Sequence, residues 1–320
     1  MRVLRWKYCN LCKDMEKEDT FKIGNTSLIE LTRLRQQTGA LAHVFGKAEY
    51  ENAGGSIKDR VALAIIQDAE EKGTLTKGGT IVEATSGNTG IGLALVAKQK
   101  GYRAMIFMPS TMSKERQDMI RKYGGEVVLT DGAKGMQGAV EQANAFVNNT
   151  PNCVLAGQFD NPVCVDAHYK TTSPEIDCAL QGQVDVIVAG VGTGGTLTGI
   201  GKYFKEKNPQ TYVVAVEPSA SPLLSKGVAG AHGIQGIGAN FIPSILDRTI
   251  YDEVQTVTEE DALFWAKLMR KEENAFVGIS SGAAVCVAMR LATRKEYAGK
   301  NVVVILPDSA DRYLSVKNFL

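Results

Sequence analysis

The sequence predicts an α/β protein of two domains, each an open, twisted and mostly parallel sheet covered by helices. Three observations support this fold class. A chain of 320 residues is too long for one small core. Apolar strand-like runs alternate with helix-like segments, which is typical of a parallel sheet covered on both faces. Finally, glycine-rich corners join several strands to the helices that follow them.

Strands and helices are expected at short intervals along the chain. Gly24 to Ser27 turn the chain into an apolar strand at 28–31, and another strand is expected at 42–47. A helix is expected at 60–71 because its polar residues fall opposite its apolar ones, and Gly73 ends it. Further strands are expected at 80–84, 104–108, 126–130, 184–189, 211–216 and 301–306, and further helices at 89–101, 113–123, after Gly132, and at 196–207, 258–271 and 282–297.

The composition limits the classes of partner. The 36 basic and 35 acidic side chains nearly cancel, which removes a global electrostatic reason to expect nucleic acid or an anionic membrane. No apolar run approaches the length of a membrane span, and the first residues lack the apolar core of a signal peptide. A small-molecule ligand and a cytoplasmic location are therefore expected.

The six cysteines do not indicate a disulfide framework. Four of them are dispersed through apolar stretches, which in a reducing compartment favours buried thiols: Cys153, Cys164, Cys178 and Cys286. Cys9 and Cys12 have the spacing of a zinc clamp or a redox dithiol, but no second pair of ligands follows. An incidental pair is favoured, and no metal site is predicted.

A lysine at a strand-to-helix corner is the first functional feature. Gly54 and Gly55 let the backbone approach a ligand, Ser56 can cap the helix, and Lys58 falls in its first turn. The positive end of a helix dipole disfavours the charged form of an amine, and an uncharged lysine can form a Schiff base. The alternative is a solvated surface lysine, the usual fate of this residue type.

A second corner, at 85–90, reads Thr-Ser-Gly-Asn-Thr-Gly. Its hydroxyls, amide and backbone N–H groups at a helix N-terminus suit a carboxylate. Helix capping is the alternative, but it needs only one of Thr85, Ser86 and Asn88. The corner is therefore richer in polar groups than capping requires.

A third corner, at 192–196, reads Gly-Thr-Gly-Gly-Thr, and its successive N–H groups suit a phosphate. The glycines at 190, 192 and 195 also fit a dinucleotide fingerprint, and Glu217 stands about where a ribose-binding acid is expected. An NAD-dependent dehydrogenase is therefore the competing class. That class gives no task to Lys58 or to the corner at 85–90.

The last corner, at 278–284, can place a hydroxyl against a heterocyclic nitrogen, although alone it reads as a well-capped helix start. Together the corners supply an amine, a carboxylate cradle, a phosphate cradle and a serine. These are the groups that pyridoxal phosphate (PLP) needs when it acts on an amino acid.

The same motifs carry a resemblance to a known family. From about Phe21 to the C-terminus, the sequence resembles the PLP-dependent enzymes of fold type II, specifically O-acetylserine sulfhydrylase (cysteine synthase) and the catalytic core of cystathionine β-synthase. The matching motifs are, in order, residues 23–26, 54–60, 85–90, 192–196, 236–238, 278–284 and 306–308. The resemblance implies PLP in the cleft between a smaller mobile substrate-binding domain (48–161) and a larger PLP-binding domain (23–47 plus 162–320), with an N-terminal arm at 1–22.

The resemblance also assigns roles to individual residues. Lys58 is the Schiff-base lysine and the catalytic base, Asn88 bonds the ring oxygen of PLP, and Ser280 faces its pyridine nitrogen. The phosphate is held by Gly192, Thr193, Gly194, Gly195 and Thr196, and the substrate carboxylate by Thr85, Ser86, Thr89 and Gln158.

The implied reaction is β-replacement on a β-substituted L-amino acid. The amino acid loses its β-substituent to give an α-aminoacrylate, to which sulfide or a thiol adds. Residues 132–138 and 235–238 follow cysteine synthase, so synthesis of cysteine from O-acetyl-L-serine and sulfide is expected. A homodimer is implied, and serine acetyltransferase is a further partner to consider.

Several residues depart from the cysteine synthase pattern. Ser27 stands where the family usually has proline, and the segment after Gln158 contains Asp160 and Asp166 in place of a second Asn-Pro. Residues 52–56 and 167–169 look more like cystathionine β-synthase. Because an acid near the cleft can activate water or repel bisulfide, the alternative is a cystathionine β-synthase-like enzyme or one that releases hydrogen sulfide from cysteine.

Overall fold

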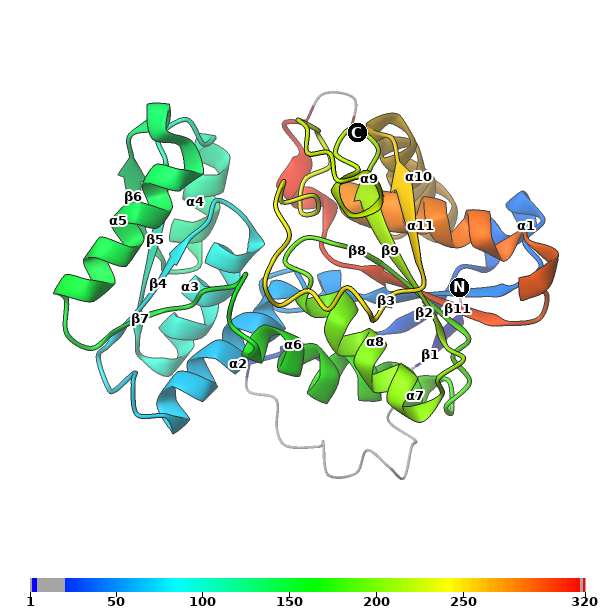
Figure 1. Ribbon diagram of the computed structural model, residues 1–320, viewed down its shortest axis with the longest axis horizontal. Coiled ribbons are helices and arrows are strands. Elements are labelled where there is room, and N and C mark those ends of the chain that lie inside the picture. Colours follow the sequence, from blue (N-terminus) through cyan, green and yellow to red (C-terminus); the bar gives the residue numbers. More distant parts are fainter. Residues whose placement is uncertain (1, 5–20, 317–318, 320) are drawn as a thin grey trace. The chain divides into compact units, whose positions relative to one another are not determined.

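The computed structural model describes residues 2–4, 21–316 and 319 (Figure 1). The chain divides into two compact units. The larger unit comprises strand β1, Gly24–Glu51 and His168–Leu320, and the smaller unit comprises residues 21–23 and Asn52–Ala167. The mobility and substrate-binding role expected for the smaller domain remain predictions. Most of the expected N-terminal arm, including Cys9 and Cys12, lies outside the described residues.

Within the described residues, the larger unit contains a seven-stranded sheet in the order β1-β2-β3-β11-β8-β9-β10. β2 is antiparallel to both neighbours, and the strands from β3 to β10 are parallel. The strands are β1 (Arg2–Leu4), β2 (Leu28–Glu30), β3 (His43–Ala48), β8 (Val186–Gly190), β9 (Tyr212–Pro218), β10 (Glu253–Val257) and β11 (Asn301–Leu306). The helices are α1 (Thr32–Thr38), α7 (Ser173–Ala179), α8 (Gly195–Lys207), α9 (Leu223–Lys226), α10 (Glu259–Glu273) and α11 (Ile279–Ala292).

The central strands of the larger unit are covered on both faces. Every residue of β11 after Asn301 is buried, and β8 and β9 are similarly apolar. Such continuous apolar runs are typical of parallel strands between two layers of helices. Figure 1 shows α7 and α8 on one face and α10 and α11 on the other. All residues of α11 except Arg290 are buried, so this helix runs through the core.

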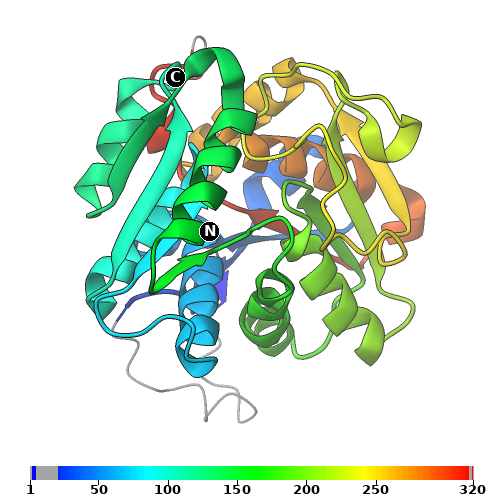
Figure 2. The same cartoon turned by 60° about the vertical axis from the view of Figure 1, so that its left-hand side comes forward.

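Over residues 52–167, all of which the structure describes, the smaller unit contains a four-stranded parallel sheet in the order β6-β5-β4-β7. Its strands are β4 (Thr80–Ala84), β5 (Arg103–Pro109), β6 (Glu126–Thr130) and β7 (Cys153–Leu155). Its helices are α2 (Lys58–Glu71), α3 (Asn88–Lys100), α4 (Lys114–Lys122), α5 (Gly135–Asn149) and α6 (Val163–Ala167). α5 packs on one face of the sheet and α3 on the other, as Figure 2 shows.

A buried ion pair joins β3 to α7 in the larger unit. Lys47 Nζ lies 2.6 Å from Glu175 Oε2, and the two side chains are only 1% and 2% exposed. The ammonium also donates to the carbonyl oxygen of Thr26 at 2.6 Å. Glu175 Oε1 accepts the backbone N–H of Asn25 at 2.9 Å. The pair therefore fixes the turn at 25–26, one of the motifs that carry the family resemblance.

The structure confirms the expected fold class. Strand 80–84 is observed as β4, and strand 301–306 as β11. The helix expected at 282–297 begins earlier, at Ile279, and ends at Ala292, where a separate 3-10 turn follows at Lys295–Tyr297. The described cysteines form no disulfide with one another; Cys164, Cys178 and Cys286 are buried as expected, whereas Cys153 is only partly buried.

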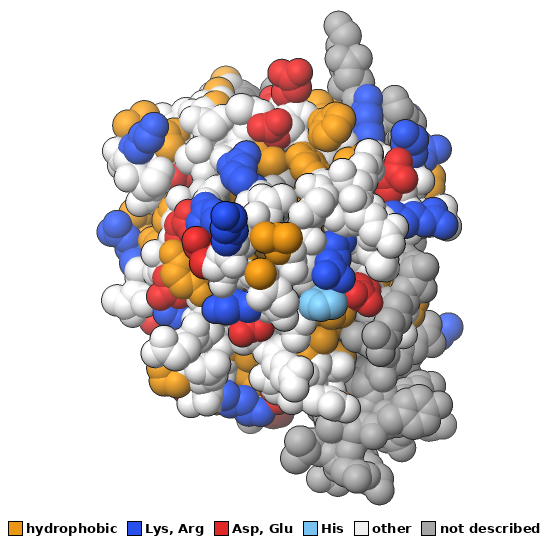
Figure 3. All heavy atoms as spheres, turned by 90° about the vertical axis from the view of Figure 1, so that its right-hand side faces the viewer, with side chains coloured by type: hydrophobic (Ala, Val, Ile, Leu, Met, Phe, Trp, Pro, Cys, Tyr) orange, Lys and Arg blue, Asp and Glu red, His pale blue; other side chains and the backbone are white. Residues whose placement is uncertain are grey.

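The surface shown in Figure 3 mixes charges of both signs. Basic and acidic side chains are interspersed on this face, and neither sign covers a continuous area. In the part of the chain that the structure describes, no helix is long and apolar enough to cross a membrane. The same residues contain no group of three or more His, Cys, Asp or Glu side chains that could hold a metal ion.

Candidate active site

Lys58 is the first residue of α2, at the corner where the sequence predicts a reactive amine. The backbone before it is held by Asp59, whose carboxylate accepts the N–H of Gly54 at 2.6 Å. Gly55 has a positive φ of 77°, a conformation that glycine adopts without strain. On the other side, a Cβ at Gly92 of α3 would lie 2.9 Å from the carbonyl oxygen of Lys58. The first turn of α2 is therefore packed tightly against α3.

The surroundings of Lys58 also include Ser56 and a buried thiol. α2 has no side-chain N-cap, but Ser56 Oγ accepts the N–H of Lys58 at 3.3 Å. Burial raises the pKa of the Cys164 thiol to about 12, and the positive charge of Lys58 opposes this rise. The Lys58 ammonium therefore acts electrostatically on the interior of the smaller unit.

The residues expected to bind a carboxylate come together at the start of α3. Asn88 is the first residue of this helix, which no side chain caps. Thr85 Oγ1 accepts the N–H of Gly87 at 3.3 Å, and Thr89 Oγ1 donates to Gln158 Oε1 at 2.5 Å. Gln158 lies in the loop after β7, so two separate segments form this polar cluster. No side chain caps α3 at its N-cap residue, Gly87, although the N–H of Gly87 itself donates to the Thr85 hydroxyl.

Ser86 has a cationic partner that sequence reasoning missed. Arg116 Nη1, on α4, donates to Ser86 Oγ at 3.2 Å. Because the Ser86 oxygen accepts in this bond, its own O–H can donate to a carboxylate. The charge of Arg116 also favours an anion at this place. No sequence signal pointed to Arg116, since it lies 30 positions from Ser86 on a mostly polar helix.

Residues 192–196 link β8 to α8, as the sequence predicts. A Cβ at Gly192 would collide with the carbonyl oxygen of Gly236. Gly194 has a φ of +87°, and a Cβ there would lie 2.7 Å from Leu246 Cβ. Thr196 Oγ1 lies 3.2 Å from Nε2 of the buried His168. The close approach of these segments therefore requires glycine at two positions.

This loop fits a phosphate group. α8 begins at Gly195 without a side-chain cap, so the N–H groups of its first turn and the positive end of its dipole can act on an anion. Thr193 is only 7% exposed, yet within the described residues its hydroxyl makes no hydrogen bond. The uncapped helix start and one buried hydroxyl thus supply donors for phosphate oxygens.

Ser280 lies in the first turn of α11 and is buried. Its hydroxyl has no hydrogen bond to any residue that the structure describes, which fits a ring nitrogen as its partner. A Cβ at Gly236 would lie 3.4 Å from Ser280 Oγ. Since the carbonyl of Gly236 also lies close to Gly192, the loop at 236–238 lies against both residues 192–196 and Ser280. Next to Gly278, the residue before α11, Tyr313 Oη donates to Asp308 Oδ2 at 2.5 Å.

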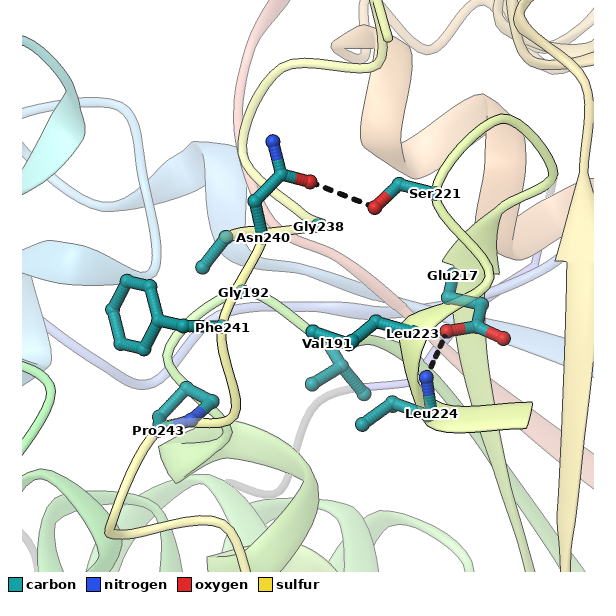
Figure 4. Close-up of a pocket in the computed structure, with 11 residues that line it drawn as sticks. Val191, Gly192, Glu217, Ser221, Leu223, Leu224, Gly238, Asn240, Phe241 and Pro243 are labelled. Atoms are coloured by element: carbon teal, nitrogen blue, oxygen red, sulfur yellow. Dashed lines mark hydrogen bonds between the residues drawn. The ribbon is translucent and has the colours of Figure 1, made fainter. Parts of the chain in front are cut away.

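Glu217, the acid that the dehydrogenase alternative requires, lines a small pocket beside residues 192–196 (Figure 4). The pocket is lined by Val191 and Gly192, by Glu217 at the end of β9, and by residues 238–241. The carboxylate of Glu217 accepts the backbone N–H groups of Leu224 at 2.7 Å and Ser225 at 3.1 Å. These bonds hold the start of α9, so the acid that the dehydrogenase alternative requires is already used by the fold.

The site residues belong to two groups. The smaller unit carries Lys58, Thr85, Ser86, Asn88, Thr89 and Gln158, and the larger unit carries Ser280 and residues 192–196. Asp160 and Asp166 are exposed on the smaller unit, and their role stays a prediction. Sequence reasoning also missed Glu83, two positions before Thr85. The available signal was an acid inside an otherwise apolar strand.

Comparison with known proteins identifies the family. Residues 20–308 match the model of the pyridoxal-phosphate dependent enzymes. A cysteine synthase of Staphylococcus aureus is 46% identical over 295 residues, which are 92% of this chain and 94% of that protein. The solved structure of a cysteine synthase from Entamoeba histolytica matches with a TM-score of 0.90 at 40% identity, covering 93% of this chain and 89% of that one. A hydrogen sulfide-producing enzyme from Fusobacterium nucleatum matches with a TM-score of 0.85 at 41% identity, covering 92% and 98%. The chain therefore belongs to the family of pyridoxal-phosphate dependent enzymes, as its motifs imply.

Proposed function

We propose that this protein catalyses a PLP-dependent β-replacement that makes cysteine from O-acetyl-L-serine and sulfide. One observation carries the proposal: a lysine and a carboxylate-binding cluster stand at the N-terminal ends of two helices, α2 and α3, that pack together. An amino acid held by its carboxylate at Thr85, Ser86 and Gln158 would present its α-carbon to an amine nearby. The similarity to the Staphylococcus aureus cysteine synthase supports the choice of substrates.

In this reaction, residues 192–196 and Ser280 would bind the cofactor, and Lys58 would transfer a proton. When bound, PLP withdraws electrons from the α-carbon of an attached amino acid. Lys58 Nζ would hold the cofactor, and the same amine would act as the base that takes the proton from the α-carbon of the amino acid. Residues 192–196 hold the phosphate through backbone N–H groups. Ser280 bonds the ring nitrogen with a neutral hydroxyl, which does not enforce a positive charge there.

The role of Lys58 is tested by covalent trapping. Wild-type protein loaded with PLP, treated with borohydride and digested should yield a peptide labelled at Lys58. Lys58→Ala should lose the label and the turnover but still bind PLP through the phosphate loop. Lys72→Ala is the matched control, because Lys72 follows the same helix and is 62% exposed. Wild-type protein that gives no labelled peptide would refute the proposal.

The carboxylate assignment predicts weaker substrate binding when a donor is removed. Gln158→Ala should raise the KM for the amino acid by about tenfold or more, since a hydrogen bond to a charged group is worth roughly 1.5–3 kcal/mol. The affinity for PLP should stay unchanged, because this residue is assigned to the substrate alone. An unchanged KM together with lower stability would mean that Gln158 is only structural.

A second candidate reaction is the release of hydrogen sulfide from cysteine. It is favoured by the exposed acid Asp160, two positions after Gln158, which could repel bisulfide or activate water. The similarity to the Fusobacterium nucleatum enzyme points the same way. Product analysis separates the two reactions. Cysteine and acetate from O-acetylserine with sulfide support the first, whereas sulfide from cysteine alone, with O-acetylserine inert, supports the second.

We also infer a homodimer from the family resemblance, with serine acetyltransferase as a partner to be tested. Light scattering of the purified chain measures the first property. Co-elution of the purified chain with a serine acetyltransferase measures the second. A monomer at micromolar concentration would refute the dimer.

A further inference from the structure

Glu83 is an acid buried inside the sheet of the smaller unit. It lies in β4, whose five residues are all buried, and Glu83 itself is 5% exposed. Oε1 accepts the backbone N–H of Ala84 at 3.1 Å, and Oε2 accepts that of Gln158 at 3.2 Å. Within the described residues no cation forms an ion pair with this carboxylate. A buried carboxylate of this kind is costly, and the fold offsets the cost with backbone N–H groups alone.

The two bonds of Glu83 join the two segments of the carboxylate-binding cluster. Ala84 immediately precedes Thr85, which opens the corner at the start of α3. Gln158 comes from the loop after β7, and β7 is the neighbour of β4 in the sheet. A single side chain thus sets the spacing between the backbone of the corner and the backbone of Gln158.

A third bond orients the side chain of Gln158. Its Oε1 accepts from Thr89 Oγ1 at 2.5 Å. An amide has one oxygen and one NH₂ group, so with the oxygen engaged the NH₂ group is left to donate to a carboxylate. Glu83 fixes the backbone and Thr89 fixes the amide of the same residue. The NH₂ donor of Gln158 is therefore positioned both through the backbone of this residue and through its side-chain amide.

We propose that Glu83 is a positioning residue for the substrate: its ionised carboxylate holds Gln158 and the Thr85 corner at the spacing that the α-carboxylate of the amino acid requires. This inference rests on the function proposed above and adds a residue that contacts neither substrate nor cofactor. It also predicts a dependence on pH. An ionised carboxylate can accept both N–H groups, whereas a protonated one has an O–H in place of one acceptor.

The electrostatic surroundings place this change near neutral pH. Burial raises the pKa of Glu83 to about 7, against the lowering effect of the N–H groups of Gln158, Ala84 and Gly157. The carboxylate of Asp160, in the loop after β7, raises it further. The thiol of Cys164 on α6 stays neutral, because burial raises its pKa to about 12. Lys58 of α2 lowers the pKa of this thiol and Glu83 raises it, so the positive charge of Lys58 also lies in this neighbourhood. Binding of the amino acid should therefore strengthen as pH rises through about 7.

The test compares Glu83→Gln with Glu126→Gln, which makes the same change on an exposed strand of the same sheet. The amide in Glu83→Gln can accept only one of the two N–H groups. We expect a rise in KM for the amino acid of about tenfold or more, a change in kcat below about threefold, and unchanged PLP affinity. The rise of kcat/KM with pH near pH 7 should disappear in Glu83→Gln and persist in Glu126→Gln.

If Glu83→Gln does not fold, Glu83→Asp and the pH-dependent unfolding of the wild-type apoprotein test the same role. Glu83→Asp keeps the charge but is too short to reach both N–H groups, so it should raise KM and retain a rise of kcat/KM with pH. Unfolding of the wild-type apoprotein as a function of pH should detect the same ionisation. Wild-type kcat/KM without a rise near pH 7, or with affinity falling as pH rises through 7, would overturn the inference. Absence of any amino-acid turnover by wild type would instead refute the proposed function.

Discussion

The buried ion pair between Lys47 and Glu175 allows a quantitative test of what holds the larger unit together. In Lys47→Met the Glu175 carboxylate stays in a site where it is 2% exposed, but it loses the cation at 2.6 Å. Removing one partner of a buried pair costs about 3–5 kcal/mol, because the remaining charge loses its counter-ion. Proteins are stable by only about 5–15 kcal/mol. The variant should therefore lose a large share of its free energy of unfolding.

Removing the second charge should restore part of this loss. In the double variant Lys47→Met/Glu175→Gln no charge remains, and the glutamine oxygen can still accept the N–H of Asn25. The carbonyl of Thr26 lacks its ammonium donor, which costs about 1–3 kcal/mol. We expect the double variant to be about 2 kcal/mol more stable than Lys47→Met alone, the difference between these two costs.

The free energy of unfolding of the larger unit can be measured by urea unfolding, followed by the fluorescence of Trp265 on α10. A Trp6→Phe background leaves Trp265 as the one tryptophan in the sequence. Lys271→Met is the control, because Lys271 is 77% exposed and its pairing with Glu272 should be worth less than about 1 kcal/mol. A cost of Lys47→Met below about 1 kcal/mol would refute the reasoning. So would a double variant whose loss equals the sum of the two single losses.

Three further predictions follow from contacts described above. Gly192→Ala should weaken PLP binding, measured by equilibrium dialysis, by tenfold or more (~1.4 kcal/mol), because its Cβ would collide with the backbone of Gly236. Arg116→Gln should raise the KM for the amino acid but leave kcat nearly unchanged, because it removes the donor and the charge behind Ser86. Burial raises the pKa of Glu83 from 4.5 to about 7, so the folded apoprotein binds more protons than the unfolded chain between these values. Its contribution to the free energy of unfolding, measured in urea, should therefore fall by about 3 kcal/mol as pH rises through this window.

Each of these predictions has a control or a contrary outcome. Arg121→Gln changes an exposed arginine of the same helix and should leave KM unchanged. Glu126→Gln should leave the pH dependence between 4.5 and 7 intact, whereas Glu83→Gln should reduce it. Unchanged PLP affinity in Gly192→Ala would mean that the loop at 236–238 can move away. Equal KM values in Arg116→Gln and wild type would mean that Arg116 does not act on the substrate.

The parts of the fold that the sequence predicted are those fixed by local pattern. Long apolar runs such as β11 and helices with one polar face such as α2 can be predicted from the local sequence alone. β7 was missed because it has three residues, all only half-buried. β10 was missed because its run Glu-Val-Gln-Thr-Val is short and half polar, and only its pairing with β9 makes it a strand.

The same distinction holds in the candidate site. The glycine-rich corners could be found because their composition exceeds what a turn or a cap requires. Arg116 gave no such signal, and Glu83 showed only an acid within an apolar strand, because their hydrogen-bond partners lie 30 and 75 positions away. Only the strand pairing and helix packing bring such residues into contact. Sequence therefore predicts which groups are available, and long-range structure determines which of them support the others.

The insertion of the smaller unit between β3 and the rest of the larger sheet has a consequence for biosynthesis. β3 pairs with β11, so the hydrogen bonds between residues 43–48 and residues 301–306 can form only after residues 301–306 have been synthesised. Asn52–Ala167, by contrast, is one continuous stretch that contains its whole four-stranded sheet. At roughly 5–20 residues per second, a ribosome takes on the order of 10 s to travel from the end of that stretch to β11. The nascent chain should thus carry a folded smaller unit and open edges on β3 and β8 during this time, and those edges are where a chaperone would be needed most.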